Sequence, residues 1–218
     1  MGLRICFLWT LLLSGAMVAA QSKNILPGGT KLIRFNLLGI MDPAETNLSF
    51  GFEYRFCDNW AISSDAAWIF YSANFEHTRH TNGFIVRPAL RYYTGERKRL
   101  FLESELHYKY VVYRIEDWLG RNCVNGTPAF EEYKRFSYRK QVIGLNLKAG
   151  YQGRISKSNR IWFELYAGIG LRIKFEDILH ENNCCYTNAI GILDENFVNG
   201  KLHPAVPVGA RVLYRLWD

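Results

Sequence analysis

Residues 160–175, RIWFELYAGIGLRIKF, alternate between two kinds of position with a period of two. One row is apolar throughout, whereas the other holds Glu164, Arg172 and Lys174 beside glycines and aromatics. A period of two places the rows on opposite faces of a β-strand, and about 9–11 residues are enough for a tilted strand to cross a bilayer. The segment therefore predicts a strand with one face suited to lipid.

The same alternation recurs along the chain and predicts eight strands, at 31–41, 47–56, 60–71, 83–93, 99–113, 138–154, 161–175 and 205–217. The connections at 57–59, 94–98 and 155–159 are tight. Those at 72–82, 114–136 and 176–203 are long, and only 41–46 is short among them. This asymmetry is typical of outer-membrane barrels, which have short periplasmic turns and longer external loops. Pro88 predicts a local irregularity in its strand, since proline cannot donate to a ladder.

Alternation alone does not say which face lies inside, because a soluble lipocalin-like barrel has an apolar interior. Here the apolar rows end in aromatics such as Trp60 and Tyr92 at one side and Trp68 and Phe84 at the other. The polar rows combine glycines with charges of both signs. We therefore predict an all-β fold, an eight-stranded antiparallel up-and-down transmembrane barrel.

The first 20 residues have the character of a signal peptide. Arg4 precedes an apolar run at 5–13, and Val18-Ala19-Ala20 suits signal peptidase. The mature barrel domain is then 21–218, in the outer membrane with both termini periplasmic. The net charge of +7 does not indicate a nucleic-acid partner, because an exported chain with no basic helix lacks that footprint; it is better explained by a charged lumen or by anionic lipid headgroups.

The inward rows are rich in charge, and their members are Arg34, Glu53, Arg55, Asp65, Arg87, Arg91, Glu103, Glu105, His107, Lys109, Lys148, Glu164, Arg172, Lys174, Arg211 and Arg215. Side chains fill the interior of an eight-stranded barrel, and buried charges must be paired. We therefore expect an ion-pair network that plugs the lumen. The turn near residue 97 sets Arg91 opposite Glu103 and Arg87 opposite His107, and the 42–46 turn sets Arg34 near Glu53.

Other functions stay open at this point. A small gated pore would use the same charged lumen, and His107 beside Glu103 and Glu105 could be drawn as acid–base chemistry. A lipid-modifying enzyme would need a nucleophile and a histidine; the available residues are His77, His80, Ser72 and Asp65, whose spacing is not specific. We assign no catalytic residue, no cofactor and no metal.

The predicted external loops carry the remaining signals. Cys123 lies in one, and Cys184 and Cys185 lie in the next, so an oxidising compartment allows Cys123 to pair with either member. Cys57 is expected to be a free thiol. Trp118, Phe130, Tyr133 and Ile190 make these loops more apolar than solvated linkers. They either pack on one another or contact a surface protein or a glycan.

Three stretches carry a family resemblance: NLSFGFEYRF, GFIVRPALRYYTGERKRLFLESELHYKY and HPAVPVGARVLYRLW. They resemble a family of small outer-membrane barrels of unknown function from Bacteroidetes-type bacteria, of the OmpA/OmpX type. VGARVLYRLW is similar to the closing strand that the barrel-assembly machinery recognises, although Asp218 follows its last aromatic. The resemblance implies surroundings of outer-membrane lipid and lipopolysaccharide, a structural or surface-interaction role, and no catalytic residue to transfer.

Overall fold

The computed structural model describes residues 26–42, 44–75, 77–124, 127–156, 158–181, 184–186 and 200–216. The predicted signal peptide, Trp217 and Asp218 lie outside these residues, as does Ile190. The strands are β1 (Lys31–Asn36), β2 (Glu45–Arg55), β3 (Trp60–Ser72), β4 (Thr78–Thr94), β5 (Leu100–Arg121), β6 (Phe130–Arg154), β7 (Ile161–Leu179), β8 (Cys184–Cys185), β9 (Leu202–Ala205) and β10 (Val208–Arg215). None of the described segments forms a helix with the length and apolar character needed to span a membrane.

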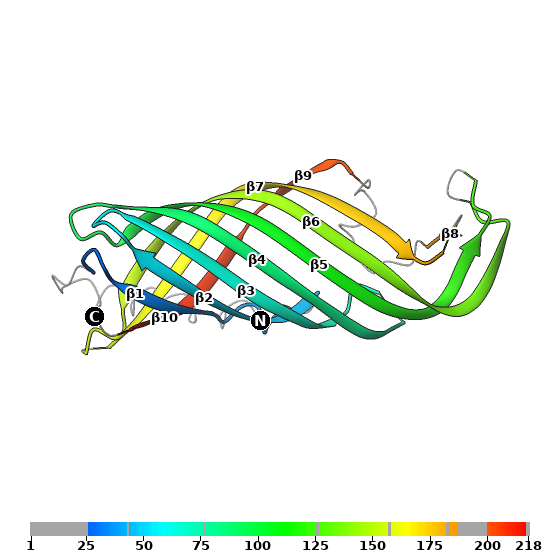
Figure 1. The fold of residues 1–218 in the computed structure, drawn as a ribbon, viewed down its shortest axis with the longest axis horizontal. Coiled ribbons are helices and arrows are strands. Elements are labelled where there is room, and N and C mark those ends of the chain that lie inside the picture. Colours follow the sequence, from blue (N-terminus) through cyan, green and yellow to red (C-terminus); the bar gives the residue numbers. More distant parts are fainter. Residues whose placement is uncertain are drawn as a thin grey trace, which may run out of the picture.

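Eight strands close into a ring of antiparallel ladders (Figure 1). β1 to β7 pair in sequence order, and β10 joins the two ends because it pairs with both β7 and β1. β9 pairs with β7 in the same register as β10 does, and it continues the wall beyond β10. The predicted eight-stranded antiparallel barrel is therefore confirmed as the fold.

Burial distinguishes the two faces of every wall strand. On β7 the apolar row is exposed, whereas Trp162, Glu164, Tyr166 and Lys174 are buried. β5 behaves in the same way, with Leu102 and Leu106 outside and Glu103, Glu105 and His107 inside. The barrel is thus inverted relative to a soluble protein: its interior is charged and aromatic, and its exterior is apolar.

The prediction of a long loop at 114–136 is wrong, because β5 and β6 continue as one hairpin from Arg121 back to Phe130. Figure 1 shows this hairpin running beyond the other strands. Its inward row on β5 is mainly apolar, with Val111, Tyr113, Ile115 and Leu119 in one core with Phe75 and Phe136, and the buried Asp117 interrupts this row. The polarity of the two faces reverses in this projecting hairpin, so it resembles a soluble β-structure there.

Other boundaries also differ from the predictions. β1 ends at Asn36, and β4 begins at Thr78 inside the predicted 72–82 loop. A β-bulge inserts Phe70 between Ile69 and Tyr71, and a bulge shifts the face of the residue that follows it. Strict alternation from Asp65 would place Tyr71 on the inner face, but after the bulge it is exposed.

The three alignments that the turns predict are present, and for the first hairpin Arg34 Nη1 lies 3.8 Å from Glu53 Oε2. Arg91 pairs with Glu103, and Val86 pairs with Tyr108, which aligns Arg87 with His107. The ladder between β4 and β5 is interrupted between Val86 and Ala89. The missing pairs include Pro88, as expected for a residue without an amide hydrogen.

Candidate functional site

The centre of the barrel interior is Arg91 on β4, which contacts three carboxylates from three other strands. Its Nη1 donates to Glu53 at 2.9 Å, and both Nη atoms donate to Glu164 at 2.6 and 2.7 Å. Its Nε donates to Glu103. All four side chains are fully buried. Multidentate contacts of this kind use the fixed fork of the guanidinium, which a lysine cannot reproduce.

Two further arginines surround Asp65 on β3. Arg34 Nη2 donates to Asp65 Oδ2 at 3.0 Å, and Arg211 Nη2 lies 2.9 Å from the same oxygen. Arg211 also donates to Glu164 at 2.6 Å, which connects this group to Arg91. Gly51 makes room for the carboxylate, since a Cβ at this position would lie 1.9 Å from Asp65 Oδ1.

Lys148 and Arg55 complete the set at its edges. Lys148 donates to Glu105 and, at 3.2 Å, to Glu103. Arg55 donates to Glu53 at 3.5 Å. We call these ten side chains the balanced cluster, because its five cations face five carboxylates: Arg34, Arg55, Arg91, Lys148 and Arg211 with Glu53, Asp65, Glu103, Glu105 and Glu164.

Aromatic rings separate the charges of the balanced cluster. Tyr93 donates its hydroxyl to Glu53 at 2.5 Å and lies 3.6 Å below the Arg55 guanidinium. Arg91 stacks over Phe101 at 4.3 Å and Arg211 over Tyr166 at 4.2 Å. Tyr93 and Phe101 were not among the residues predicted for the inward network. Tyr93 lies two residues from Arg91 and Phe101 two residues from Glu103, so alternation places them on the same inner face. That spacing is the signal that could have identified them.

Six of the sixteen residues predicted for the network lie outside the balanced cluster: Arg87, His107, Lys109, Arg172, Lys174 and Arg215. Arg87, His107 and Arg172 line a cavity of about 300 Å³ on the side of the balanced cluster that faces the projecting hairpin. Within the described part of the chain, none of the three makes an ion pair with a carboxylate. His107 Nε2 and Arg172 Nε are buried without a hydrogen-bond partner.

The residues considered for an enzyme do not come together. Asp65 belongs to the balanced cluster, and Ser72 donates to the Ala44 carbonyl at 2.7 Å. His77 lies 3.3 Å from Asp117, and His80 is exposed on the outer face. No group of three metal-binding side chains occurs among the residues with described positions.

The outer face changes character along the barrel. Leucines and isoleucines cover its middle, and Trp60 packs on Tyr92 at 4.9 Å near the tight turns. Toward the hairpin, Trp68 donates to Asn82 at 3.0 Å. Beyond that level the outer face is charged. There Glu116 contacts Arg79 and Arg135, and the hydrogen bonds, led by the one from Arg135, hold the pKa of this carboxyl below its ordinary value.

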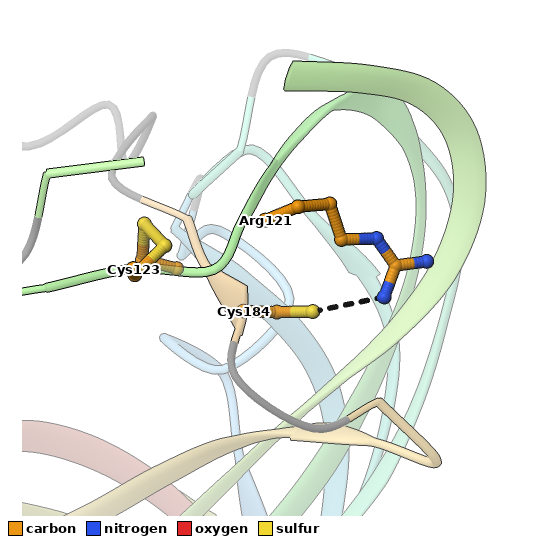
Figure 2. Close-up of a disulfide and its surroundings, with 4 residues drawn as sticks. Arg121, Cys123 and Cys184 are labelled. Carbon is orange, nitrogen blue, oxygen red and sulfur yellow. Dashed lines mark hydrogen bonds between the residues drawn. A yellow bond between two sulfur atoms is a disulfide. The ribbon is translucent and has the colours of Figure 1, made fainter. Parts of the chain in front are cut away.

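The cysteines lie beside the tip of the projecting hairpin (Figure 2). Cys123 and Cys185 form a disulfide with a Cα–Cα distance of 6.1 Å. Cys184 is not part of it; its sulfur accepts a hydrogen bond from Arg121 Nη1 at 3.2 Å. Cys57 is an exposed free thiol. The disulfide joins β8 to the hairpin tip, where Gly120 and Arg121 also pair with the two cysteines.

We expect Cys185→Ser to remove this cross-link and Cys184→Ser to leave it intact. In the second variant both members of the disulfide remain, whereas Cys184 needs a different backbone position to replace Cys185. Peptide mapping by mass spectrometry without reduction measures the Cys123-containing peptide directly. A Cys123 peptide linked to Cys184 in the unmodified protein would contradict this assignment.

Fold and interior together define a class: a closed antiparallel barrel with a charged core and an apolar outer surface. The model of the family described as "Protein of unknown function (DUF3575)" matches residues 8–190, and the chain belongs to this family. No curated protein and no solved structure matches the chain.

Proposed function

We propose that this protein is a small outer-membrane barrel whose interior is closed by side chains. Its role in this proposal is structural or surface-interacting, through the projecting hairpin. The observation that carries the proposal is the inverted polarity of the wall. Leu102, Leu106, Leu145, Leu147 and Leu171 are each at least 48 % exposed, while the balanced cluster is buried. Water would oppose that arrangement, whereas a bilayer favours it.

The limits of the exposed apolar surface support the same environment. Aromatic side chains such as Trp60 and Tyr92 lie near one limit, and Trp68, Phe84 and Tyr110 lie near the other. Tryptophan and tyrosine favour membrane interfaces. The charges that follow, including Arg114 and Arg135, then lie at the level of anionic headgroups. The predicted signal peptide is consistent with export to such a membrane.

The balance of charge supports the closed lumen of this proposal. Five cations and five carboxylates occupy the section around Arg91, with Tyr93, Phe101 and Tyr166 between them. An eight-stranded barrel has little further space at that level. The proposal therefore assigns no conducting channel to this barrel and leaves interaction to the part that projects.

The hairpin offers a surface for such an interaction. Trp118 and Tyr133 face outward from β5 and β6 with their rings 5.5 Å apart, and both are more than half exposed. Tryptophan and tyrosine are enriched among the residues that contribute most to binding at protein–protein interfaces. The disulfide to β8 would hold this tip in place in an oxidising compartment.

Two measurements test the proposal. In membrane fractions of the source cells, the unheated protein should co-fractionate with the outer membrane and migrate differently from the boiled protein on a gel. The purified protein in planar bilayers should give no steady channels on the nanosiemens scale. A soluble periplasmic protein would refute the membrane assignment, and steady large channels would refute the closed lumen.

A further inference from the structure

The lumen cavity beside the balanced cluster has an unusual electrostatic composition. Arg87 on β4, His107 on β5 and Arg172 on β7 all line it. Both arginines are half-buried, and like charges that share a partly enclosed space repel one another. The balanced cluster next to it offsets such repulsion by pairing every cation.

The carboxylates around the cavity already have partners. Glu45 accepts hydrogen bonds from Lys109 at 2.5 Å and from Tyr113 at 2.6 Å. Glu105 accepts from Lys148 and, at 2.9 Å, from Asn146. Asp42 Oδ1 accepts from the backbone amide of Ala44 at 3.0 Å. No ion pair joins Arg87 or Arg172 to any of them among the residues that the structure describes.

Besides the carboxylates already described, the cavity lining includes the guanidinium groups of Arg87 and Arg172 and the imidazole of His107. The two guanidinium groups offer several N–H donors, and Arg172 Nε and His107 Nε2 have no partner within the described residues. His107 is only 6 % exposed. Two full positive charges with fork-shaped donors match an anion that carries two charges and several acceptor oxygens, which is the chemistry of a phosphate group.

Part of the cavity lining lies where β1 and β10 meet in the barrel wall. The β1–β10 ladder ends at the pair Asn36–Arg211, and Pro207 precedes β10 without an amide hydrogen to donate. Leu38, Val206 and Val208 line the cavity there and are exposed. A ligand whose polar group lies in the cavity could therefore extend an apolar chain along the outer wall.

We propose that the cavity formed by Arg87, His107 and Arg172 binds the phosphate group of a small ligand. Free phosphate and the headgroup of a phosphorylated lipid share this chemistry. The lipid source rests on the proposed membrane function, whereas recognition of the phosphate group itself does not. The two arginines supply the charge, and His107 supplies a further polar contact.

The test uses the folded full-length mature protein in micelles of a non-ionic detergent, with binding measured by isothermal titration calorimetry. The probes are inorganic phosphate, dihexanoyl phosphatidic acid and, as a zwitterionic control, dihexanoyl phosphatidylcholine. Saturable binding of phosphate or phosphatidic acid, at least about tenfold weakened by Arg87→Gln or Arg172→Gln, supports the site, because each replacement removes charge-assisted hydrogen bonds. Arg139→Gln, which removes an exposed arginine that pairs with Asp177, should leave the affinity unchanged.

The relative affinities identify the source of the phosphate group. Phosphatidic acid that binds at least about tenfold tighter than phosphate indicates a lipid headgroup, and equal affinities indicate a free anion. Absence of saturable binding by both anions would overturn the proposal. So would affinities that neither arginine variant reduces.

Stability separates a binding role from a structural one. Without phosphate, Arg172→Gln should unfold at the same urea concentration as the unmodified protein or a higher one, because no carboxylate loses a partner. A large loss of stability would mean that the arginine is structural and would overturn the site. A membrane barrel that binds neither anion refutes this inference alone, whereas a soluble protein that binds inorganic phosphate refutes the proposed function alone.

Discussion

Arg91→Met is expected to prevent most molecules of the protein from folding into the barrel. The substitution keeps the apolar stem but leaves Glu53, Glu103 and Glu164 without their shared cation. Breaking one buried pair typically costs about 3–5 kcal/mol, and three carboxylates are affected here. Whole proteins are stable by only about 5–15 kcal/mol, so we expect an effect at the upper end of the single-pair range or beyond.

The loss of stability is measured by urea titration in detergent micelles, with the mobility of the unheated protein on gels as the readout of folding. Arg139→Met is the matched control, because Arg139 makes a two-pronged contact with Asp177, at 2.7 and 2.6 Å, on the outer face. That exposed pair should contribute less than about 1 kcal/mol. Adding Glu164→Gln to Arg91→Met should restore part of the stability, since it again leaves equal numbers of cations and carboxylates in the balanced cluster. If Arg91→Met and Arg139→Met behave alike, the cluster does not stabilise the barrel.

Leu145→Arg is expected to destabilise the barrel in lipid vesicles by about 2–4 kcal/mol. Leu145 lies on the outer face of β6 between Leu106 on β5 and Leu171 on β7, and it is 48 % exposed. A bilayer cannot solvate a guanidinium at that depth. A soluble barrel would instead tolerate the change, because surface substitutions usually alter stability by about 0.5 kcal/mol or less.

Val124→Arg provides the control for this prediction. Val124 is 71 % exposed and lies at the hairpin tip, beyond the apolar surface. It receives the same side chain but should remain near wild-type stability. Equilibrium unfolding in vesicles, monitored by tryptophan fluorescence, compares the two variants. Equal and small effects would show that the leucine surface does not face lipid.

The two predictions examine opposite faces of one wall. A charge removed from the inside and a charge added to the outside should both destabilise the barrel, which is the reverse of a soluble protein. Together they would separate a membrane barrel from a soluble barrel with an unusual core. The lumen cavity adds a third class of position, where removal of an arginine is expected to leave stability unchanged.

The sequence predicted the wall well where alternation was clean. In β2 and β7 the apolar and polar rows keep their parity over most of the strand, so faces and partners followed from counting. It failed at 114–136. There the inward row of β5 becomes mainly apolar and the outward row gains charges, so the pattern of an apolar outer face stops even though the strands continue. The bulge at Phe70 was not predicted, because a single inserted residue does not change the local composition of the strand.

The interior illustrates the same division. Parity alone identified Arg34, Glu103, Glu164 and Arg211 as inward residues, and turn position set Arg91 opposite Glu103. The contacts from Arg91 to Glu53 and Glu164 cross the barrel between strands that are not neighbours. Such contacts depend on closure, shear and the rotamers of long side chains, none of which has a local sequence signal.

The sequence by itself determined the strands, their order and the face of most side chains, because period-two alternation is a local property of an extended backbone. Only the tertiary structure decided which inward charges compensate one another. It brought five carboxylates to five cations around Arg91 and placed Arg87 and Arg172 at a separate cavity. The physical reason is that pairing across a closed barrel is a matter of distance in space, which closure of the ring alone establishes.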